Sequence, residues 1–436
     1  MRKHHISLTA LALAAYCCCG LRAQQTNPTL TLQQAQALAL KNQPLLLASQ
    51  ANVSRVGQLV RETTSAYYPT VNGEITGSQA NNGARIGAGF LTDSRLFSRF
   101  GYGLTVSQLI TDSGRTPNLV ASSRLLEQSS EKDYQSTRYN VILGVDQAYY
   151  DTLLAQALVH VAEQTVATRQ TVVDQVSELT KNKLKSQVDL SFAQVNLSDA
   201  KLMLIRAKNQ LQAAYANLNQ ALGTDQSATY QLQEQGLPPA PSPSPEPLVS
   251  EAYKSRPELA SLQLQRASDE KFFYAERDLN RPTVSLTAVG GSLPLIAPGT
   301  VTTPIPYGYE GAAVNVHIPV FNGHLFSARR EAAQYRLAVT NQRVRDLEQR
   351  IARDVRVAWG RSQTAYEAIG ATRQLLDQAN LALDLAQGRY RLGLSSIVEL
   401  TQAQLGQTQA QVQNLQAKYD YQEAYAFLQY TLGGLQ

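Results

Sequence analysis

Residue types that could carry out chemistry are few and scattered in this sequence. His160, His317 and His324 lie far apart, and neither a His-Glu-x-x-His motif nor a pair of carboxylates at ligand spacing accompanies them. The Gly-Ala-Gly at 87–89 and the Gly-Tyr-Gly at 101–103 resemble parts of a phosphate loop, but their surroundings are typical of strands and loops. No nucleophile elbow surrounds a serine. The sequence therefore predicts no catalytic residue, no cofactor and no metal site, and it argues against an enzyme.

The three cysteines are confined to the segment Met1–Ala23. This segment has a basic start, a short apolar core at Ile6–Tyr16 and the small residue Ala23 before a cut ahead of Gln24, as in a secretory signal peptide. A mature chain beginning at Gln24 would have no cysteine for a disulfide, a metal or a thiol nucleophile. A lipid anchor on Cys19 is the alternative, but the residues that precede Cys19 do not fit the pattern of such anchors.

The charge of the chain gives no indication of a nucleic-acid partner. Lys and Arg number 39 against 34 Asp and Glu, and removing residues 1–23 lowers the net charge from +5 to +2, since three basic residues go with them. Tyrosine is frequent, with 21 copies, yet no basic stripe accompanies it. No later segment is apolar over the roughly 20 residues that a transmembrane helix needs, so a membrane role would have to come from strands.

The sequence contains an internal duplication. When its second half is aligned with its first, Pro69 pairs with Pro282 and Gly223 pairs with Gly433. A proline-rich stretch separates the two halves and is expected to be a stiff connector. We therefore expect a signal peptide at 1–23, a first repeat at 24–235, a linker at 236–247 and a second repeat at 248–436.

Each half has the same predicted order of elements: helices, two strands of period two, a very long helix, a tight turn and a returning helix. Thr31 and Gln34 form a capping box at the first helix. Thr116 followed by Pro117 indicates the N-cap and first residue of the long helix. We expect helices at Pro44–Ala66, Pro117–Asn182, Gln187–Leu222 and His324–Leu392, and strands at Thr70–Gln79, Phe100–Leu109, Thr283–Gly290 and Gly311–Val320.

The helix lengths predict a rod. The helix expected at Pro117–Asn182 would be about 100 Å long, at a rise of about 1.5 Å per residue. The two shorter helices, Pro44–Ala66 and Gln187–Leu222, would together roughly match that length if they were stacked end to end. Leucines from Leu190 to Leu218 and alanines from Ala193 to Ala221 recur at every seventh position, and alanines from Ala403 to Ala424 repeat the small series. These heptads predict closely packed coiled coils, although an ordinary antiparallel hairpin in a helical bundle explains them equally well.

The strands predict an oligomer. Four amphipathic strands per chain cannot close a membrane barrel, because the smallest such barrels have about eight strands. An open sheet would leave unpaired edge groups, which lipid does not tolerate. Three copies would supply twelve strands to one outer-membrane barrel. The alternative is a soluble β-hairpin cap on a coiled coil. The predicted fold class is mostly α with a β-barrel portion, completed as a trimer.

This organisation resembles the TolC-like outer-membrane efflux family over essentially the whole mature chain. The resemblance rests on the duplicated order of elements, on Pro69 and Pro282 where the chain would pass into the barrel, and on the turn RYRLGLSSIVELTQAQ that begins at Arg389. It implies a trimer with a twelve-stranded barrel in the outer membrane and a twelve-helix tunnel in the periplasm. It also implies a periplasmic adaptor protein and an inner-membrane pump as partners.

The resemblance further implies a gate at the periplasmic tip, held shut by hydrogen bonds and ion pairs and narrowed by acidic rings. Tyr390 occupies the position of a gate tyrosine, and Asp189 and Glu399 occupy acidic positions. The turn residues that match the family's tip, or stand in its place in the first half, are Gly393, Leu394, Ser395, Lys183, Leu184 and Ser186. Three residues depart from the pattern: Ser395 replaces a gate arginine, Gln402 replaces a second acid, and Lys183 replaces a glycine. A contact from a lysine to Asp189 or Glu399 is the expected substitute for the missing arginine pair.

We therefore predict the exit duct of an efflux or type I secretion system, passing small molecules or exported proteins. A passive porin is disfavoured because it would need many more strands per chain. A periplasmic coiled-coil scaffold or adaptor is the remaining alternative, and it should wash off membranes without detergent.

Overall fold

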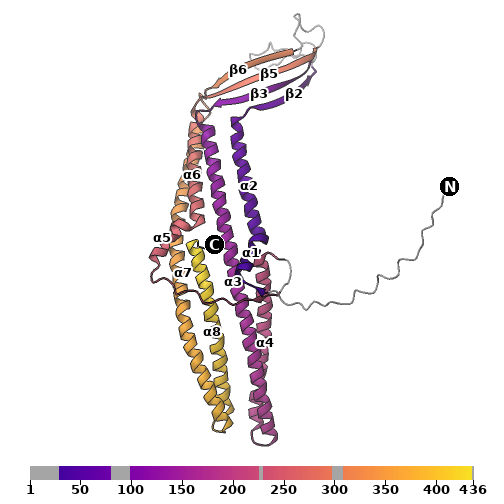
Figure 1. Ribbon diagram of the computed structural model, residues 1–436. Coiled ribbons are helices and arrows are strands. Elements are labelled where there is room, and N and C mark those ends of the chain that lie inside the picture. The colour runs from indigo at the N-terminus through magenta and orange to yellow at the C-terminus, as the bar shows by residue number, and fades with distance from the viewer. Residues whose placement is uncertain (1–28, 80–98, 225–228, 297–307, 435–436) are drawn as a thin grey trace, which may run out of the picture.

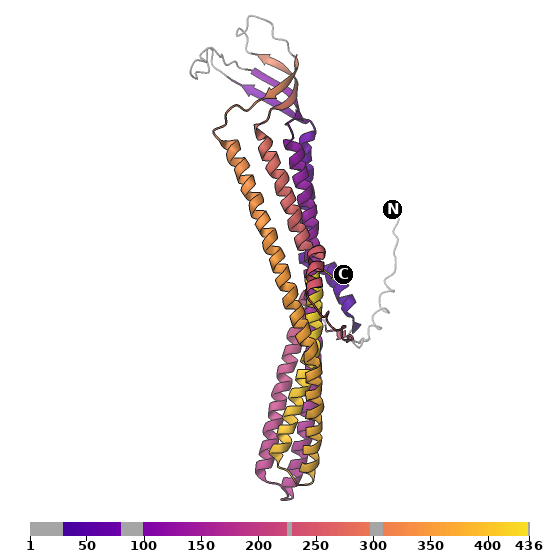
Figure 2. The same ribbon diagram turned by 90° about the vertical axis from the view of Figure 1, so that its left-hand side faces the viewer.

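The computed structural model describes residues 29–79, 99–224, 229–296 and 308–434. The predicted signal peptide at 1–23 and the Gly-Ala-Gly at 87–89 lie outside these residues. The described chain is a long rod with a β-sheet at one end and two tight helical turns at the other (Figures 1 and 2).

The two halves repeat one order of elements (Figure 1). The first half contains α1 (Leu32–Asn42), α2 (Pro44–Thr64), η1 (Ser65–Tyr67), β2 (Thr70–Ser78), β3 (Arg99–Thr111), α3 (Arg115–Lys181) and α4 (Gln187–Leu222). The second half contains α5 (Glu246–Ser255), α6 (Pro257–Arg277), η2 (Asp278–Asn280), β5 (Thr283–Ile296), β6 (Gly308–His317), α7 (Leu325–Arg391) and α8 (Ile397–Leu432). Both long helices, α3 and α7, have 67 residues, about 100 Å in length.

The shorter helices stack end to end beside the long ones, as predicted. Gln43 precedes a proline and is therefore extended, which ends α1 and lets α2 begin in a new direction. Its side-chain amide donates to the carbonyl oxygens of Gln220 and Ala221 at the C-terminus of α4, at 3.2 and 3.1 Å. A Cβ on Gly223 would lie 2.9 Å from the Asn42 backbone, so only glycine allows this close junction.

The second half repeats this junction between α8 and α6. Arg256 also precedes a proline and is extended, and its Nε donates to the Thr431 carbonyl at 2.8 Å. A Cβ on Gly433 would lie 2.8 Å from the Ser255 carbonyl oxygen. Each long helix is thus flanked by a nearly continuous pair of shorter helices.

The predicted N-cap of α3 is wrong by two positions. Gly114, rather than Thr116, is the N-cap, and Thr116 lies in the first turn. The backbone N–H and the hydroxyl of Thr116 donate to the buried Asp112 carboxylate at 2.7 and 2.6 Å. Asp112 therefore satisfies free donors at this helix end, and Pro117 still falls in the first turn, where no N–H is needed.

Most of the small heptad series is buried. The buried members are Ala193, Ala200, Ala207 and Ala214 of α4 and Ala410 and Ala417 of α8. Ala221, Ala403 and Ala424, at the ends of the two series, are half-buried. Small side chains at these positions let α3 and α4, and α7 and α8, approach closely along the lower part of the rod (Figure 2).

The four long strands form one antiparallel sheet in the order β2-β3-β5-β6. The strand predicted for Gly311–Val320 is too long at its end, because β6 pairs with β5 only as far as His317 and Thr283, and residues 318–320 have no partner there. Within the described chain, β2 and β6 are the edges of the sheet.

The register gives the sheet two unlike faces. Residues that pair directly across two strands share a face of the sheet, and so do residues two positions apart in one strand. By this rule one face carries Val71, Ile75, Leu104, Leu286 and Val314. Ile75 is 77% and Val314 68% exposed. The opposite face carries Thr70, Asn72, Glu74, Thr105, Ser107, Ser285, Thr287 and Asn315. The sheet is therefore amphipathic across all four strands.

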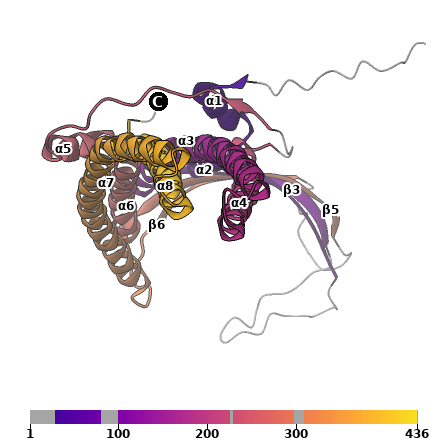
Figure 3. The same cartoon turned by 90° about the horizontal axis from the view of Figure 1, so that it is seen from below.

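Residues 229–245, which we call the strap, run across the helices from beside α1 to α5 (Figure 3), at mid-height of the rod (Figure 1). The strap begins with β4 (Gln231–Leu232), which pairs in parallel with β1 (Thr29–Leu30). The buried Tyr149 hydroxyl of α3 lies 2.9 Å from the carbonyl oxygens of Leu30 and Gln233. Trp359 of α7 donates its indole N–H to the Ser242 carbonyl at 2.7 Å. Tyr149 and Trp359, equivalent in the duplication, thus both fasten the strap.

Candidate functional site

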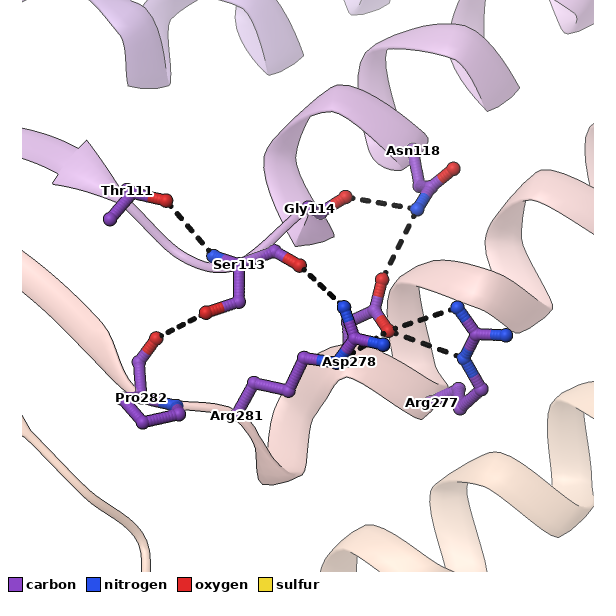
Figure 4. Close-up of polar contacts among 8 residues, drawn as sticks. All are labelled: Thr111, Ser113, Gly114, Asn118, Arg277, Asp278, Arg281 and Pro282. Atoms are coloured by element: carbon purple, nitrogen blue, oxygen red, sulfur yellow. Dashed lines mark hydrogen bonds and ion pairs between the residues drawn. The ribbon is translucent and has the colours of Figure 1, made fainter.

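The sheet joins the helices at two prolines. Pro69 lies directly before β2 and Pro282 directly before β5, where the sequence predicts passage into the strands. The Ser113 hydroxyl, after β3, donates to the Pro282 carbonyl at 2.7 Å, and Arg281 donates to the Ser113 carbonyl at 3.1 Å (Figure 4). These bonds connect the first half of the chain to the second at the base of the sheet.

A buried carboxylate completes this junction. Asp278 is 3% exposed and forms ion pairs with Arg277 and Arg281 at 3.2 and 3.4 Å (Figure 4). Asn118 of α3 donates to the same carboxylate at 3.3 Å and to the Gly114 carbonyl at 2.9 Å. This buried carboxylate has a structural role, since removing Asp278 would leave its arginine partners unpaired and removing the arginines would leave a buried negative charge unpaired.

The opposite end of the rod consists of two equivalent turns. Lys183 (φ +56°) and Gly393 (φ +73°) hold the same left-handed position in the α3–α4 and α7–α8 turns. Lys183 thus adopts the conformation that the replaced glycine would have, at a backbone cost of about 1–2 kcal/mol. Leu184 and Leu394 project from the turns and are 69% and 67% exposed.

The two returning helices begin differently. Ser186 and Asp189 form a reciprocal capping box at α4, with both hydrogen bonds at 3.1 Å. Ser396 caps α8 by accepting from the Glu399 N–H at 3.4 Å, but the Glu399 carboxylate pairs instead with Arg389 at 3.2 Å. Asp189 and Glu399 are therefore equivalent in position but engaged in different contacts.

Tyr390 lies in the small core that joins the two hairpins at the tip. It is 8% exposed and packs in a cluster with Val176 of α3 and with Ile397 and Leu400 of α8. Leu190 of α4 packs against the same cluster. Side chains from all four helices thus meet around one aromatic ring, so this core holds the hairpins together.

The polar contacts of Tyr390 are few. Lys185, from the first hairpin, places its ammonium 4.5 Å from the centre of the ring, a cation–π contact. Burial, and secondarily the charge of Asp189, raise the pKa of the Tyr390 hydroxyl. That hydroxyl has no hydrogen-bond partner within the described chain, and neither has the buried Ser395 hydroxyl.

The structure brings some of the predicted tip residues together and leaves others apart. The predicted residues Tyr390 and Asp189 are close, across the seam between the hairpins, and Lys185 of the first turn lies over the Tyr390 ring. The expected lysine–carboxylate contact is not formed: neither Lys183 nor Lys185 makes an ion pair within the described residues. The Arg389–Glu399 pair escaped the sequence analysis, although the two residues stand at equal distances on either side of Leu394.

A second charged group lies at mid-height, where α3 and α8 meet. Burial, followed by the charge of Asp151, raises the pKa of Glu423 to about 8. The same two causes raise the pKa of Asp420. Asp420 and Glu423 line a groove of about 770 Å³ that also includes Arg361 of α7. Glu423 therefore resists ionisation near neutral pH.

The described residues contain no cluster of three His, Cys, Asp or Glu arranged to hold a metal ion.

Within the described ranges, none of the helices is long and apolar enough to cross a membrane.

Long paired hairpins that end in tight turns, carrying an amphipathic sheet at the other end, define a channel-forming chain. The sequence model described as "Outer membrane efflux protein" matches residues 31–224 and 248–434, so the chain belongs to the outer membrane efflux protein family. The family consists of outer-membrane channels, not enzymes, and the helical rod is its periplasmic extension. This chain is accordingly an outer-membrane efflux channel.

The chain is also similar in sequence to individual efflux proteins. The chain is 24% identical to the outer membrane efflux protein BepC of Brucella suis biovar 1 (strain 1330), over 92% of this chain and 85% of that protein. It is 25% identical to the cation efflux system protein CusC of Escherichia coli O157:H7, over 84% and 78%.

Solved structures show the same fold. A crystal structure of CusC superposes with a TM-score of 0.80 at 20% identity, covering 93% of this chain and 92% of that one. The outer membrane protein VceC of Vibrio cholerae superposes with a TM-score of 0.79 at 16% identity, covering 92% and 96%.

Proposed function

We propose that three copies of this chain form one exit duct, with a twelve-stranded barrel in the outer membrane and a periplasmic tunnel of helices. The observation that carries the proposal is the amphipathic four-stranded sheet whose edges, β2 and β6, have no partner within the described chain. Lipid would leave those edge groups unsatisfied, whereas β2 of one copy can pair with β6 of the next. The apolar face would then meet lipid and the polar face would line the lumen.

The tip is the proposed closed end of the duct. The core around Tyr390 draws the two hairpins of one chain together, and the charged residues beside it include Asp189, Glu399, Lys183 and Lys185. The turn residues Leu184, Ser186, Gly393, Leu394 and Ser395 form the proposed outermost rim. Exposed leucines on that rim suit contact with a periplasmic adaptor protein, which would link the duct to an inner-membrane pump.

The remaining parts of the proposal concern the chain itself. Residues 1–23 are the proposed signal peptide, 24–235 and 248–436 the two efflux repeats, and 236–247 the linker between them. Mass spectrometry of the purified protein should find Gln24 at the N-terminus without an acyl chain. An acylated Cys19 would reverse that assignment.

Light scattering of the detergent-purified protein tests the assembly. We expect a mass of three chains and resistance of the protein to extraction from membranes by salt or alkali alone. A folded monomer in detergent would overturn the shared barrel, and release from membranes without detergent would favour a periplasmic scaffold instead.

A further inference from the structure

One cavity in the lower half of the rod is lined by buried polar groups that have no role in the proposed duct. It measures about 390 Å³ and lies between α3 and the α7–α8 hairpin. The lining residues that matter here are Thr165, Arg169, Leu383, Gln404, Thr408 and Gln411. None of the residues that line the cavity is acidic, and Arg169 is the only one among them that carries a charge.

Arg169 is a buried cation without a partner. It is 7% exposed, forms no hydrogen bond or ion pair among the described residues, and its Nη1 is fully shielded from solvent. Burial lowers the pKa of its guanidinium, since the charged form is disfavoured there. Arginine nevertheless stays protonated in proteins, so a positive charge faces this cavity without a counter-charge.

A second unpaired donor lines the same cavity from the opposite helix. Gln404 of α8 is 4% exposed, and its Nε2 has no hydrogen-bond acceptor within the described chain. The threonine hydroxyls around it already donate elsewhere: Thr165 to the Val161 carbonyl and Thr408 to the Gln404 carbonyl. Two buried donors, one of them charged, therefore lack an acceptor in one place.

We propose that Arg169 and Gln404 form a binding site for a small oxyanion, of the carboxylate or sulfate class. A guanidinium offers a planar fork of donors that matches two oxygens of such a group, and the amide N–H would serve a further oxygen. The volume corresponds to about 13 waters at roughly 30 Å³ each, enough for an anion and part of its hydration shell. Glutamine and threonine side chains complete a polar, uncharged wall.

The cavity lies between the strap and the tip core. Gln404 and Gln411 follow the heptad spacing that leads to Lys418, and Lys418 pairs with Glu234 of the strap at 3.0 Å. The cavity thus lies along the face of α8 that the strap contacts at mid-height. Leu383 lines the cavity and also packs on the core around Tyr390. A bound anion would bridge α3 and α8 directly above the tip; this consequence, unlike the binding itself, rests on the proposed duct.

Thermal unfolding of the detergent-purified protein tests the site with sodium sulfate as probe, against sodium chloride at equal ionic strength. Millimolar sulfate should raise the Tm of the wild type by about 2–4 °C more than that of Arg169→Gln, since only a protein with the site binds the ion. The general stabilisation by sulfate acts on both proteins and cancels in the comparison. Arg206→Gln, which removes an exposed arginine of α4, is the matched control and should keep the full response.

A second variant tests the geometry without any added ion. Gln404→Glu places a carboxylate of nearly the same shape beside Arg169. It should therefore raise the Tm in chloride and reduce the response to sulfate to that of Arg169→Gln. Arg169→Lys, which keeps the charge but loses the fork, should weaken sulfate binding about tenfold. Equal sulfate responses in the wild type and Arg169→Gln, or an unchanged response in Gln404→Glu, would overturn the site. No transport is measured, so either result leaves the proposed duct untouched.

Discussion

The ring of Tyr390, rather than its hydroxyl, should hold the tip closed. Its hydroxyl has no partner within the described chain, whereas its ring contacts side chains from the helices of both hairpins. Tyr390→Phe removes only the unpaired hydroxyl, so we expect a change in tip stability close to zero or slightly stabilising. Tyr390→Ala removes the ring and should open the seam.

The magnitude follows from the burial of the cluster. Tyr390 is 8% exposed, and Val176 next to it is fully buried. Truncating a buried aromatic residue to alanine costs about 3–5 kcal/mol, and each 1.4 kcal/mol is roughly tenfold in a population. In Tyr390→Ala the ratio of closed to open tips should therefore fall by a factor of at least about 100. Losing the Lys185 contact alone, in Lys185→Gln, should cost only about 0.5–1 kcal/mol.

Single-channel conductance in planar bilayers measures this effect. Tyr390→Ala should raise conductance or open probability, and Tyr390→Phe should match the wild type. Leu394→Ala, at the same end but 67% exposed, is the matched control and should also match the wild type. An open channel in Tyr390→Phe, or a closed one in Tyr390→Ala, would refute closure by the ring.

The other predictions concern stability, measured by chemical unfolding of the purified protein. Lys183→Gly should stabilise the first tip turn by about 1 kcal/mol, because it relieves the left-handed φ of +56°. Ala207→Leu should cost about 1–3 kcal/mol by overpacking, whereas Ala216→Leu, on the exposed side of the same helix, should be neutral. Tyr149→Phe should cost about 0.5–1.5 kcal/mol, because it removes the hydroxyl that bonds the Leu30 carbonyl of β1 and the Gln233 carbonyl of the strap. Glu423 has a folded-state pKa of about 8, above the ordinary 4.5, so the folded protein binds more protons than the unfolded chain between these values. Stability should fall as pH rises from about 4.5 to 8, and Glu423→Gln should flatten this dependence.

The sequence predicted the elements of the fold well because their signals are local. The helix α4 has the predicted bounds, Gln187–Leu222, since Ser186 caps its beginning and Gly223 its end. The stacking of α2 on α4 was also predicted, from length alone. The error at α3 arose because the carboxylate that caps it belongs to Asp112, one turn before Thr116, and spacing does not show which of two polar residues a helix end will use.

Pairing across distant segments was harder to predict. The end of β6 depends on where β5 begins, because Thr283 is the first residue of β5 and pairs with His317. The alternation of residues 318–320 does not reveal that limit. At the tip, the resemblance located Tyr390 and Glu399, but not that Glu399 would pair within its own hairpin or that Lys185 would cover the tyrosine ring. The Lys185–Tyr390 contact depends on side-chain directions at a seam between two hairpins from opposite halves of the sequence, and no local pattern encodes it.

The duplication makes the two hairpins alike in backbone but unequal at the seam. The alignment that pairs Gly223 with Gly433 makes Thr180 the equivalent of Tyr390 in the first half, and Thr180 is not part of the tip core. Only the second hairpin therefore contributes an aromatic ring to the tip core, and the first hairpin surrounds that ring with Val176, Leu190 and Lys185. Any widening of the tip must withdraw that ring from Val176 and Leu190, which requires the α7–α8 hairpin to move against the α3–α4 hairpin. The upper ends of both hairpins are fixed by the strap and by the close junctions at Gly223 and Gly433, so this movement would pivot at mid-height.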